Sequence, residues 1–360
     1  MQKIVFVLPA LNDSHHINHV KEFIDRGYDV DVYGYERVDR KKVDYGYTAH
    51  VLAEFENASY KNRIKQYVKD FRMLGSKYKN SDAVFFLSGL DLTMFFVLIN
   101  PKARYIYEEF DLRHTYMPCT GLLEMFDKRI IRNSVMTALT SEGFIDYHFG
   151  GKCPENVALM ENKLNPSITE YSVKPRVFDK EKLSIGFVGG PRYDSVYNFI
   201  DVFCRRFPNY EFHVFGGPIL PQFEQLRKYK NCFLHGFFKN PMDLPDVYGS
   251  IDLVLATYDV KYENVKYAEP NKIYESIYFE TPIIVSSGTF LAKKVKRLGI
   301  GYDVNAMNEE EVVAFVKNLN EEDLSKKRAN AKAIEKRKTL NINDDFFAAF
   351  EKQLKIKANE

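Results

Sequence analysis

Apolar runs of strand length alternate with helix-patterned segments along the first half of the chain. The runs KIVFVL, YDVDVY, DAVFFL, RYIY and VMTAL start at Lys3, Tyr28, Asp82, Arg104 and Val135. Short apolar runs separated by helical segments are typical of a parallel sheet that helices cover on both faces. The pattern therefore predicts an α/β fold.

The first helix can be placed from its ends. Ser14 precedes its periodic positions, and Gly27 stands where a helix-terminating glycine belongs. Ile17, Val20 and Ile24 recur at helical spacing and predict its buried face.

The strand pattern begins again in the second half. The runs KLSIGFV, EFHVFG, NCFLHG, IDLVLA and TPIIVS start at Lys182, Glu211, Asn231, Ile251 and Thr281. Two Rossmann-like domains with parallel sheets facing a central cleft are expected. We place the first at 1–165, a proline-containing, aperiodic linker at 166–182 and the second at 183–340, and expect the final helix, 341–360, to pack back on the first domain.

Charge and composition exclude several classes of protein. Lysine plus arginine number 51 and aspartate plus glutamate 49, a net charge of +2 that is too balanced for an electrostatic nucleic-acid binder. No run approaches the roughly 20 apolar residues of a membrane span, and the N-terminus resembles a strand more than a signal peptide. The four cysteines form no CxxC pair. We therefore predict neither a metal site nor disulfides, and a cytoplasmic protein.

The end of the first strand of the second domain is one candidate anion site. Gly189 and Gly190 follow this strand and allow close backbone approach, and Arg192 supplies a fork suited to phosphate. Helix N-termini at such strand ends also favour anions. The spacing is not GxGxxG, and a tight turn without a ligand is the alternative interpretation.

A second candidate lies in residues 268–288, AEPNKIYESIYFETPIIVSSG. Lys272 in a first helical turn opposes the helix dipole, a conflict that a bound anion would remove. Glu275 follows about one turn later and could accept hydrogen bonds from both hydroxyls of a ribose. A surface pair of these two residues is the alternative.

Residues 268–288 resemble the PNK-x-YE … PII block of bacterial GT-B glycosyltransferases, in particular the large retaining family that builds capsule, exopolysaccharide and lipopolysaccharide chains. YDVDVYGYER, YIYEEFDLRH and NCFLHGFFKNPMDLPDVYGSIDLVLATY resemble further segments of that family, so the resemblance covers most of the chain. Tyr267 stands where the family often has a first glutamate, and Glu269 lies two positions away.

The resemblance implies a nucleotide-diphosphate sugar as donor substrate, with UDP-sugars favoured, and no cofactor. Glu275 would hold the ribose, Arg192 and Lys272 would neutralise the diphosphate, and backbone groups from His235 to Phe238 would border the base. The donor-binding residues expected on this basis are Gly189, Gly190, Arg192, His235, Gly236, Phe237, Phe238, Glu269, Asn271, Lys272 and Glu275.

Polar residues also follow strands in the first domain. Glu108, Glu109, Asp111 and His114 follow one strand, and Asp111 or His114 could orient acceptor or sugar hydroxyls. We expect the catalytic residues to be Asp111, His114, Arg192 and Lys272. The acceptor-side residues expected after the first strand are Asn12, Asp13, His15 and His16. A structural role for His114 and a helix cap for Asp13 are the alternatives.

These residues predict a transferase that moves a sugar to a saccharide or lipid-linked saccharide acceptor, retaining and independent of metal. Fixed cations would stabilise the leaving diphosphate. A nucleotide-sugar 2-epimerase and a non-catalytic nucleotide-sugar-binding subunit stay open as alternatives. Residues 61–79 mix basic and apolar positions at helical spacing, which fits either a peripheral membrane contact or a core-facing helix.

Overall fold

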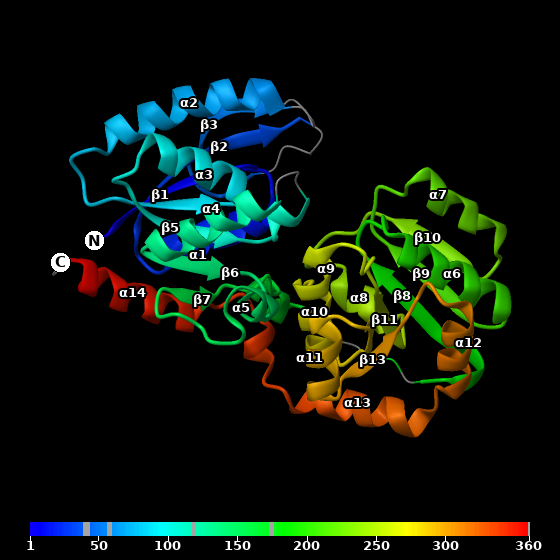
Figure 1. Cartoon of the computed structure of the whole chain (residues 1–360). Helices are drawn as coiled ribbons and strands as arrows, with labels where there is room; N and C mark the ends of the chain where they lie inside the picture. The colour runs from blue at the N-terminus through cyan, green and yellow to red at the C-terminus, as the bar shows by residue number, and fades with distance from the viewer. Residues whose placement is uncertain (39–43, 56–59, 117–119, 173–175, 177, 359–360) are drawn as a thin grey trace. The chain divides into compact units, whose positions relative to one another are not determined.

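A computed structural model describes residues 1–38, 44–55, 60–116, 120–172, 176 and 178–358 of the chain. The chain forms two compact units (Figure 1). Unit 1 consists of Met1–Glu161 and Asn343–Glu360, and unit 2 of Asn162–Ile342. The segment predicted as a linker, 166–182, falls within unit 2 in this division, and its residues 173–175 and 177 lie outside the described part.

Unit 1 is built on a parallel sheet whose described strands run in the order β3-β2-β1-β4-β5-β6-β7. The strands are β1 (Lys3–Leu8), β2 (Asp29–Arg37), β3 (His50–Phe55), β4 (Val84–Ser88), β5 (Arg104–Glu109), β6 (Met136–Leu139) and β7 (Val157–Leu159). The helices are α1 (Ser14–Asp25), α2 (Tyr60–Lys77), α3 (Leu90–Ile99), α4 (Thr120–Asn133), α5 (Glu142–Phe149) and α14 (Asp344–Ala358), with a 3-10 turn at Arg113–Tyr116. The strand order reverses between β1 and β4, so loops diverge there at the carboxyl ends of the strands.

Unit 2 contains a second parallel sheet, with its described strands in the order β10-β9-β8-β11-β12-β13. They are β8 (Ser184–Val188), β9 (Glu211–Phe215), β10 (Cys232–Gly236), β11 (Leu253–Ala256), β12 (Ile283–Ser286) and β13 (Gly301–Val304). The helices are α6 (Asp194–Arg206), α7 (Pro221–Glu224), α8 (Leu244–Gly249), α9 (Glu263–Tyr267), α10 (Lys272–Tyr278), α11 (Phe290–Leu298), α12 (Glu309–Asn318) and α13 (Glu321–Ala333). Four 3-10 turns span Pro166–Glu170, Lys180–Lys182, Gln225–Lys228 and Lys336–Thr339. Here the order reverses between β8 and β11.

The strand predictions agree with the structure. Each apolar run predicted as a strand overlaps an observed one, and β1 has the predicted bounds. The sequence pattern missed β3, β7 and β13. Two of these are only three and four residues long, and β3 is an edge strand with mostly exposed side chains. Short or half-exposed strands carry little apolar periodicity.

The predicted buried face of α1 is confirmed at Val20 but wrong at Ile24. The structure buries His16, His19, Val20 and Phe23, whereas Ile24 is 39% exposed. Both sets of positions fit a helical period, so spacing alone favoured the isoleucines. The two histidines have polar partners on the sheet, which removes the cost of burying them.

The helix α2 packs on unit 1 through its apolar positions. Tyr67, Phe71 and Leu74 are buried, while Ile64 and Met73 are 37% and 42% exposed. This burial agrees with the core-facing interpretation of residues 61–79. Among the described residues, no helix is both long and apolar enough to cross a membrane.

The last helix, α14, completes the core of unit 1, although unit 2 separates it from the rest of that unit in sequence. Phe346, Phe347 and Phe350 are almost fully buried, and the rings of Phe347 and Phe23 lie 4.7 Å apart. Figure 1 shows α14 running beside β6 and β7. Polar contacts fix its start, because both carboxylate oxygens of Glu22 accept hydrogen bonds from Asn343 at 2.7 Å.

Replacing Phe350 with alanine should destabilise unit 1 by about 3 to 5 kcal/mol, since it removes a fully buried ring. Urea unfolding of the full chain, followed by far-UV circular dichroism, measures the change. Ile356→Ala on the same helix is the control, because Ile356 is 38% exposed and should cost less than about 0.5 kcal/mol. Equal unfolding midpoints for the two variants would contradict this role of α14.

Candidate functional site

Glycine-containing turns bring the carboxyl ends of β8, β9 and β10 into close backbone contact. The amide of Gly189 donates to Phe215 O at 2.6 Å, and the amide of Gly216 donates to Gly236 O at 2.6 Å. Gly189 and Gly216 both have φ near +126°, and a β-carbon on Gly216 would lie 2.5 Å from the carbonyl oxygen of Gly189. A β-carbon on Gly190 would lie 3.1 Å from Gly217 O. These turns therefore need glycine, because a β-carbon on Gly216 or Gly190 would meet the backbone of the neighbouring turn.

The side chain of Lys272 reaches the same turn from the start of α10. Its Nζ lies 3.2 Å from the position that a β-carbon on Gly189 would occupy, and 5.5 Å from the centroid of the Phe187 ring. No carboxylate among the described residues forms an ion pair with this amine. The lysine therefore places beside the Gly189 turn a positive charge that no ion pair holds but that acts on the nearby Glu275 carboxylate.

Glu275 lies one turn further along α10 and is buried, with 6% of its surface exposed. Its Oε2 accepts a hydrogen bond from the Tyr248 hydroxyl at 2.5 Å. Burial raises the pKa of this carboxyl group, and the charge of Lys272 and the Tyr248 hydrogen bond act in the opposite direction. The alternative of a surface Lys272–Glu275 pair is therefore wrong, because the carboxylate is inside the unit.

Three other predicted donor residues lie around α10 or the β8 turn. Glu269 is buried and forms an ion pair with Lys294 at 2.6 Å. The carbonyl of Asn271 accepts the first helical hydrogen bonds of α10, from Tyr274 and Glu275. Arg192 is exposed and donates to the Tyr193 hydroxyl at 3.2 Å.

The N-terminus of α6, which follows the Gly189 turn, already has an anionic partner. The Asp259 carboxylate accepts hydrogen bonds from the amides of Asp194 and Ser195, at 3.3 and 2.8 Å. An incoming phosphate would have to compete with this carboxylate. The side chains of Lys272 and Arg192 are therefore better placed than this helix end to meet a diphosphate.

The end of β10 exposes an aromatic ring. Phe237 is 74% exposed, whereas Phe238 packs against the core formed by α8, α10 and β11. His235 stacks on Phe215, with ring centroids 4.4 Å apart, and its Nε2 lies 2.9 Å from His213 Nδ1. Gly236 has φ near +79°, which turns the chain at this point.

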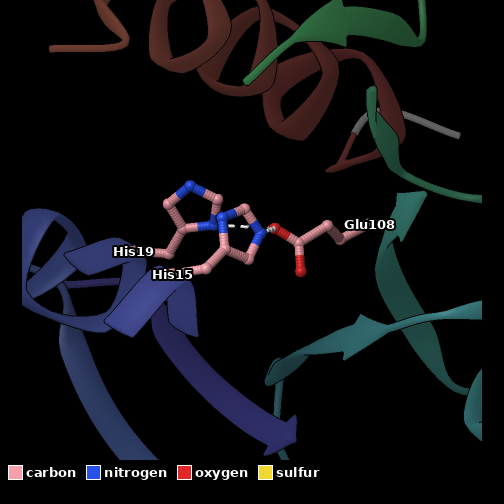
Figure 2. A group of neighbouring side chains, drawn as sticks. All are labelled: His15, His19 and Glu108. Carbon is pink, nitrogen blue, oxygen red and sulfur yellow. Dashed lines mark hydrogen bonds and ion pairs between the residues drawn. The ribbon is translucent and has the colours of Figure 1, made fainter. Parts of the chain in front are cut away.

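In unit 1 a buried carboxylate gathers histidines at the strand ends. Glu108, the fifth residue of β5, is fully buried, and its Oε1 lies 3.0 Å from His15 Nε2 and 2.7 Å from His19 Nδ1. Figure 2 shows both imidazoles, from one side of α1, directed at this carboxylate. Its Oε2 accepts a short hydrogen bond from Ser88 Oγ, and Ser88 Oγ lies 2.9 Å from His16 Nε2. We call His15, His19 and Glu108 the β5 triad.

These contacts keep Glu108 ionised. Burial alone would raise its pKa, but the neighbouring His15 and His19 outweigh burial and hold the pKa well below the usual range. Burial lowers the pKa of His16 and of His19, so these imidazoles resist protonation. Ser88 and His16 thus fix the direction of the carboxylate without adding charge.

The next residue, Glu109, faces the other side of the sheet and has the opposite properties. Burial and the negative charge of Asp127 raise its pKa well above the usual range. His148 Nε2 lies 2.8 Å from Glu109 Oε2, and His114 Nδ1 lies 3.1 Å from Asp127 Oδ2. All four side chains are fully buried. Burial lowers the pKa of His148 to about 4.

Comparison with known proteins adds the fold family. Neither protein-family models nor curated proteins match the sequence. Solved structures match it over its whole length. Sucrose-phosphate synthase from Thermosynechococcus elongatus has a TM-score of 0.70 at 12% identity, covering 100% of this chain and 99% of its own. HepE from Anabaena, solved with UDP and glucose, has a TM-score of 0.68 at 12% identity and covers 100% of both chains.

The lipopolysaccharide outer core galactosyltransferase WaaB has a TM-score of 0.64 at 13% identity, covering 99% of this chain and 100% of its own. The chain has the GT-B fold. The predicted α/β class with two Rossmann-like domains is thereby confirmed.

Within this GT-B fold the predicted donor residues gather in two places in unit 2. Gly189, Gly190 and Lys272 meet at the end of β8, and Glu275 lies beside Lys272 on α10. His235, Gly236, Phe237 and Phe238 are at the end of β10. The β9 turn lies between the two places, since a β-carbon on Gly217 would be only 3.1 Å from the Phe237 ring.

The predicted residues of unit 1 have mostly protein partners. Asn12 forms hydrogen bonds with both backbone groups of Arg37, and Asp13 caps α1 by accepting from the His15 amide at 3.1 Å. His114 is buried, and its Nε2 lies 3.0 Å from the Tyr147 hydroxyl. Asp111 is half-buried in the bend after β5.

Sequence reasoning missed His19, Asp127 and His148. The spacing of His15 and His19, four residues apart on a predicted helix, was a usable signal, because such residues share a helix face. Asp127 and His148 lie on α4 and α5, and no local pattern connects either with Glu109.

We expect the His148 imidazole to stay neutral down to a pH of about 4. The unfolded chain binds this proton near the ordinary value of about 6.5, so between the two values unfolding takes up a proton and acidification lowers stability. NMR titration of the histidine ring carbons, assigned with His148→Gln, measures the midpoint. A midpoint near 6.5 would mean that the imidazole is not buried as described.

Proposed function

We propose that the protein is a glycosyltransferase that moves a sugar from a nucleotide-diphosphate sugar to a saccharide or lipid-linked saccharide acceptor in surface polysaccharide synthesis. The observation that carries the proposal is the meeting of Lys272 with the Gly189 turn beside the buried Glu275, at the strand-order reversal of unit 2. Ligands of open parallel sheets bind at such reversals. The proposal is also supported by HepE from Anabaena, which has the same fold and was solved with UDP and with UDP-glucose.

In this proposal the diphosphate binds over the Gly189 turn. Glycine allows the backbone there to approach phosphate closely, and Lys272 offers a positive charge that is in no ion pair among the described residues. Arg192, exposed on the same loop, adds a second cation. Stabilising the negative charge that develops on a leaving diphosphate is the main demand of the reaction.

Glu275 holds the ribose in this proposal. Tyr248 donates to Oε2, and no other described residue forms a hydrogen bond with this carboxylate. Oε1 can therefore accept from a ribose hydroxyl. The exposed Phe237 ring offers a surface on which the base can stack. Uracil is the favoured base, since HepE from Anabaena and MnaA from S. aureus were both solved with UDP.

The acceptor is assigned to unit 1. His15 is 13% exposed and Asp111 is half-buried, so both can meet hydroxyl groups, whereas the buried His16 and His114 act by positioning their neighbours.

We propose a retaining transfer, in which the leaving phosphate takes the proton of the acceptor and no dedicated base is needed. A lipid-linked acceptor would bring the cytoplasmic enzyme to the inner face of the membrane as a peripheral protein.

Two substitutions should separate ribose from diphosphate recognition. Glu275→Ala should weaken binding of both UDP and uridine by about ten- to a hundredfold, because it removes a hydrogen bond to a charged group. Lys272→Met should weaken UDP binding by a similar factor and leave uridine nearly unchanged. Isothermal titration calorimetry measures all four affinities.

Glu280→Gln is the control, because Glu280 is a partly exposed carboxylate that forms only a 3.7 Å ion pair with Lys336. Its UDP affinity should match that of the wild type. Equal losses of UDP and uridine in Lys272→Met would contradict the assignment of the amine to the diphosphate.

Turnover should release the nucleoside diphosphate from a nucleotide sugar in the presence of saccharide acceptors and should persist in excess chelator. The physical reason is that protein cations, not a metal ion, meet the leaving group. Coupled detection of UDP over a panel of donors and acceptors measures it. Complete loss in chelator would refute metal independence. Interconversion of the donor without acceptor would indicate the epimerase, and binding without turnover the non-catalytic subunit.

A further inference from the structure

The β5 triad has the composition and spacing of a transition-metal site. His15 and His19 lie one turn apart on α1, and Glu108 reaches them from the end of β5. One ligand atom from each residue, Nε2, Nδ1 and Oε1, lies within 4.8 Å of the other two. Two imidazoles four residues apart on a helix, with a carboxylate from another element, form a typical three-residue set for zinc.

The two nitrogen–oxygen distances in the triad are slightly shorter than the distances between the ligand atoms of a tetrahedral zinc ion. With bonds of about 2.0 to 2.1 Å, tetrahedral ligand atoms lie about 3.3 Å apart. The two nitrogens are 3.0 and 2.7 Å from Glu108 Oε1. These two distances would each have to lengthen by about 0.3 to 0.6 Å to admit the ion.

The Nδ1 atom of His19 faces the same carboxylate oxygen as His15 Nε2. It is buried and only 2.7 Å from Glu108 Oε1, yet it forms no aligned hydrogen bond. Buried polar nitrogens almost always have a well-aligned partner. A metal ion between the two atoms would satisfy the nitrogen through its lone pair.

The surroundings of the triad are those of a metal ligand set. The second oxygen of Glu108 accepts from Ser88 Oγ, which His16 Nε2 contacts in turn. Such outer hydrogen bonds orient a ligating carboxylate. His15 is 13% exposed, so the triad has a solvent-facing edge through which an ion can enter and a water molecule can complete its coordination.

The second group of neighbouring ligand atoms, Glu109, His114 and Asp127, lacks this edge, because all three residues are fully buried. His148 Nε2 already lies 2.8 Å from Glu109 Oε2. This group is therefore a weaker candidate than the β5 triad.

We propose that His15, His19 and Glu108 bind a zinc ion, with a fourth position open to water. The ion joins α1 to β5 at the strand-order reversal of unit 1. It takes no part in the departure of the diphosphate, so this inference does not depend on the proposed transferase activity. Such a site has no continuous motif, since His15 and Glu108 are 93 residues apart.

The test measures bound metal in the full-length chain. After removal of metal by a chelator and dialysis, the wild type should bind about one equivalent of Zn²⁺ in competition with a chromophoric chelator, and Co²⁺ should give the visible absorption of a four-coordinate site. His15→Asn, His19→Asn and Glu108→Gln should each weaken Zn²⁺ binding by about a hundredfold or more.

His50→Asn is the matched control, because His50 is an exposed histidine on β3 that stacks on Tyr33 and lies outside the triad. It should bind Zn²⁺ like the wild type. Circular dichroism of the metal-free variants checks that they fold. A wild type that binds no Zn²⁺ at micromolar concentration would overturn the proposal, and so would unchanged affinity in folded His15→Asn and His19→Asn.

Discussion

Parallel strands that helices cover on both faces can carry polar chemistry only at their ends. The middles of the central strands β1, β4, β8 and β11 are buried and apolar, so their side chains can only pack. The chemically active side chains therefore collect beyond the carboxyl ends, most densely near the point where the strand order reverses. In unit 1 this point lies between β1 and β4, beside His16 and Ser88, and in unit 2 between β8 and β11, beside Gly189 and Lys272.

The end of β5 illustrates how strongly position governs a carboxyl group. Glu108 and Glu109 are adjacent and equally buried, but alternate side chains of a strand point to opposite faces. One face presents imidazoles and holds the pKa of Glu108 low, while the other presents Asp127 and raises that of Glu109. One strand thus supplies a fixed negative charge on one face of the sheet and a proton-retaining acid on the other.

The sequence predicted the two-domain α/β architecture well because apolar strands separated by amphipathic helices leave a strong periodic signal. Local chemistry also placed Lys272 and Glu275 together, since residues three apart on a helix are neighbours. The contacts that define the unit 1 site were harder to predict from the sequence. The Glu109–His148 contact joins β5 to α5, and the choice between histidines and isoleucines on α1 depended on a carboxylate far away in the chain. Long-range pairings of this kind carry no local periodicity.

The position of α14 has a consequence for the order in which the protein folds during synthesis. Unit 2 is one continuous stretch of chain and can close its core as soon as its own residues have emerged from the ribosome. Most of unit 1 is synthesised before unit 2, yet it lacks Phe346, Phe347 and Phe350 until the segment after unit 2 has been made. Until then the aromatic surface around Phe23 stays uncovered, so the part of the protein that is made first is the last to complete its core.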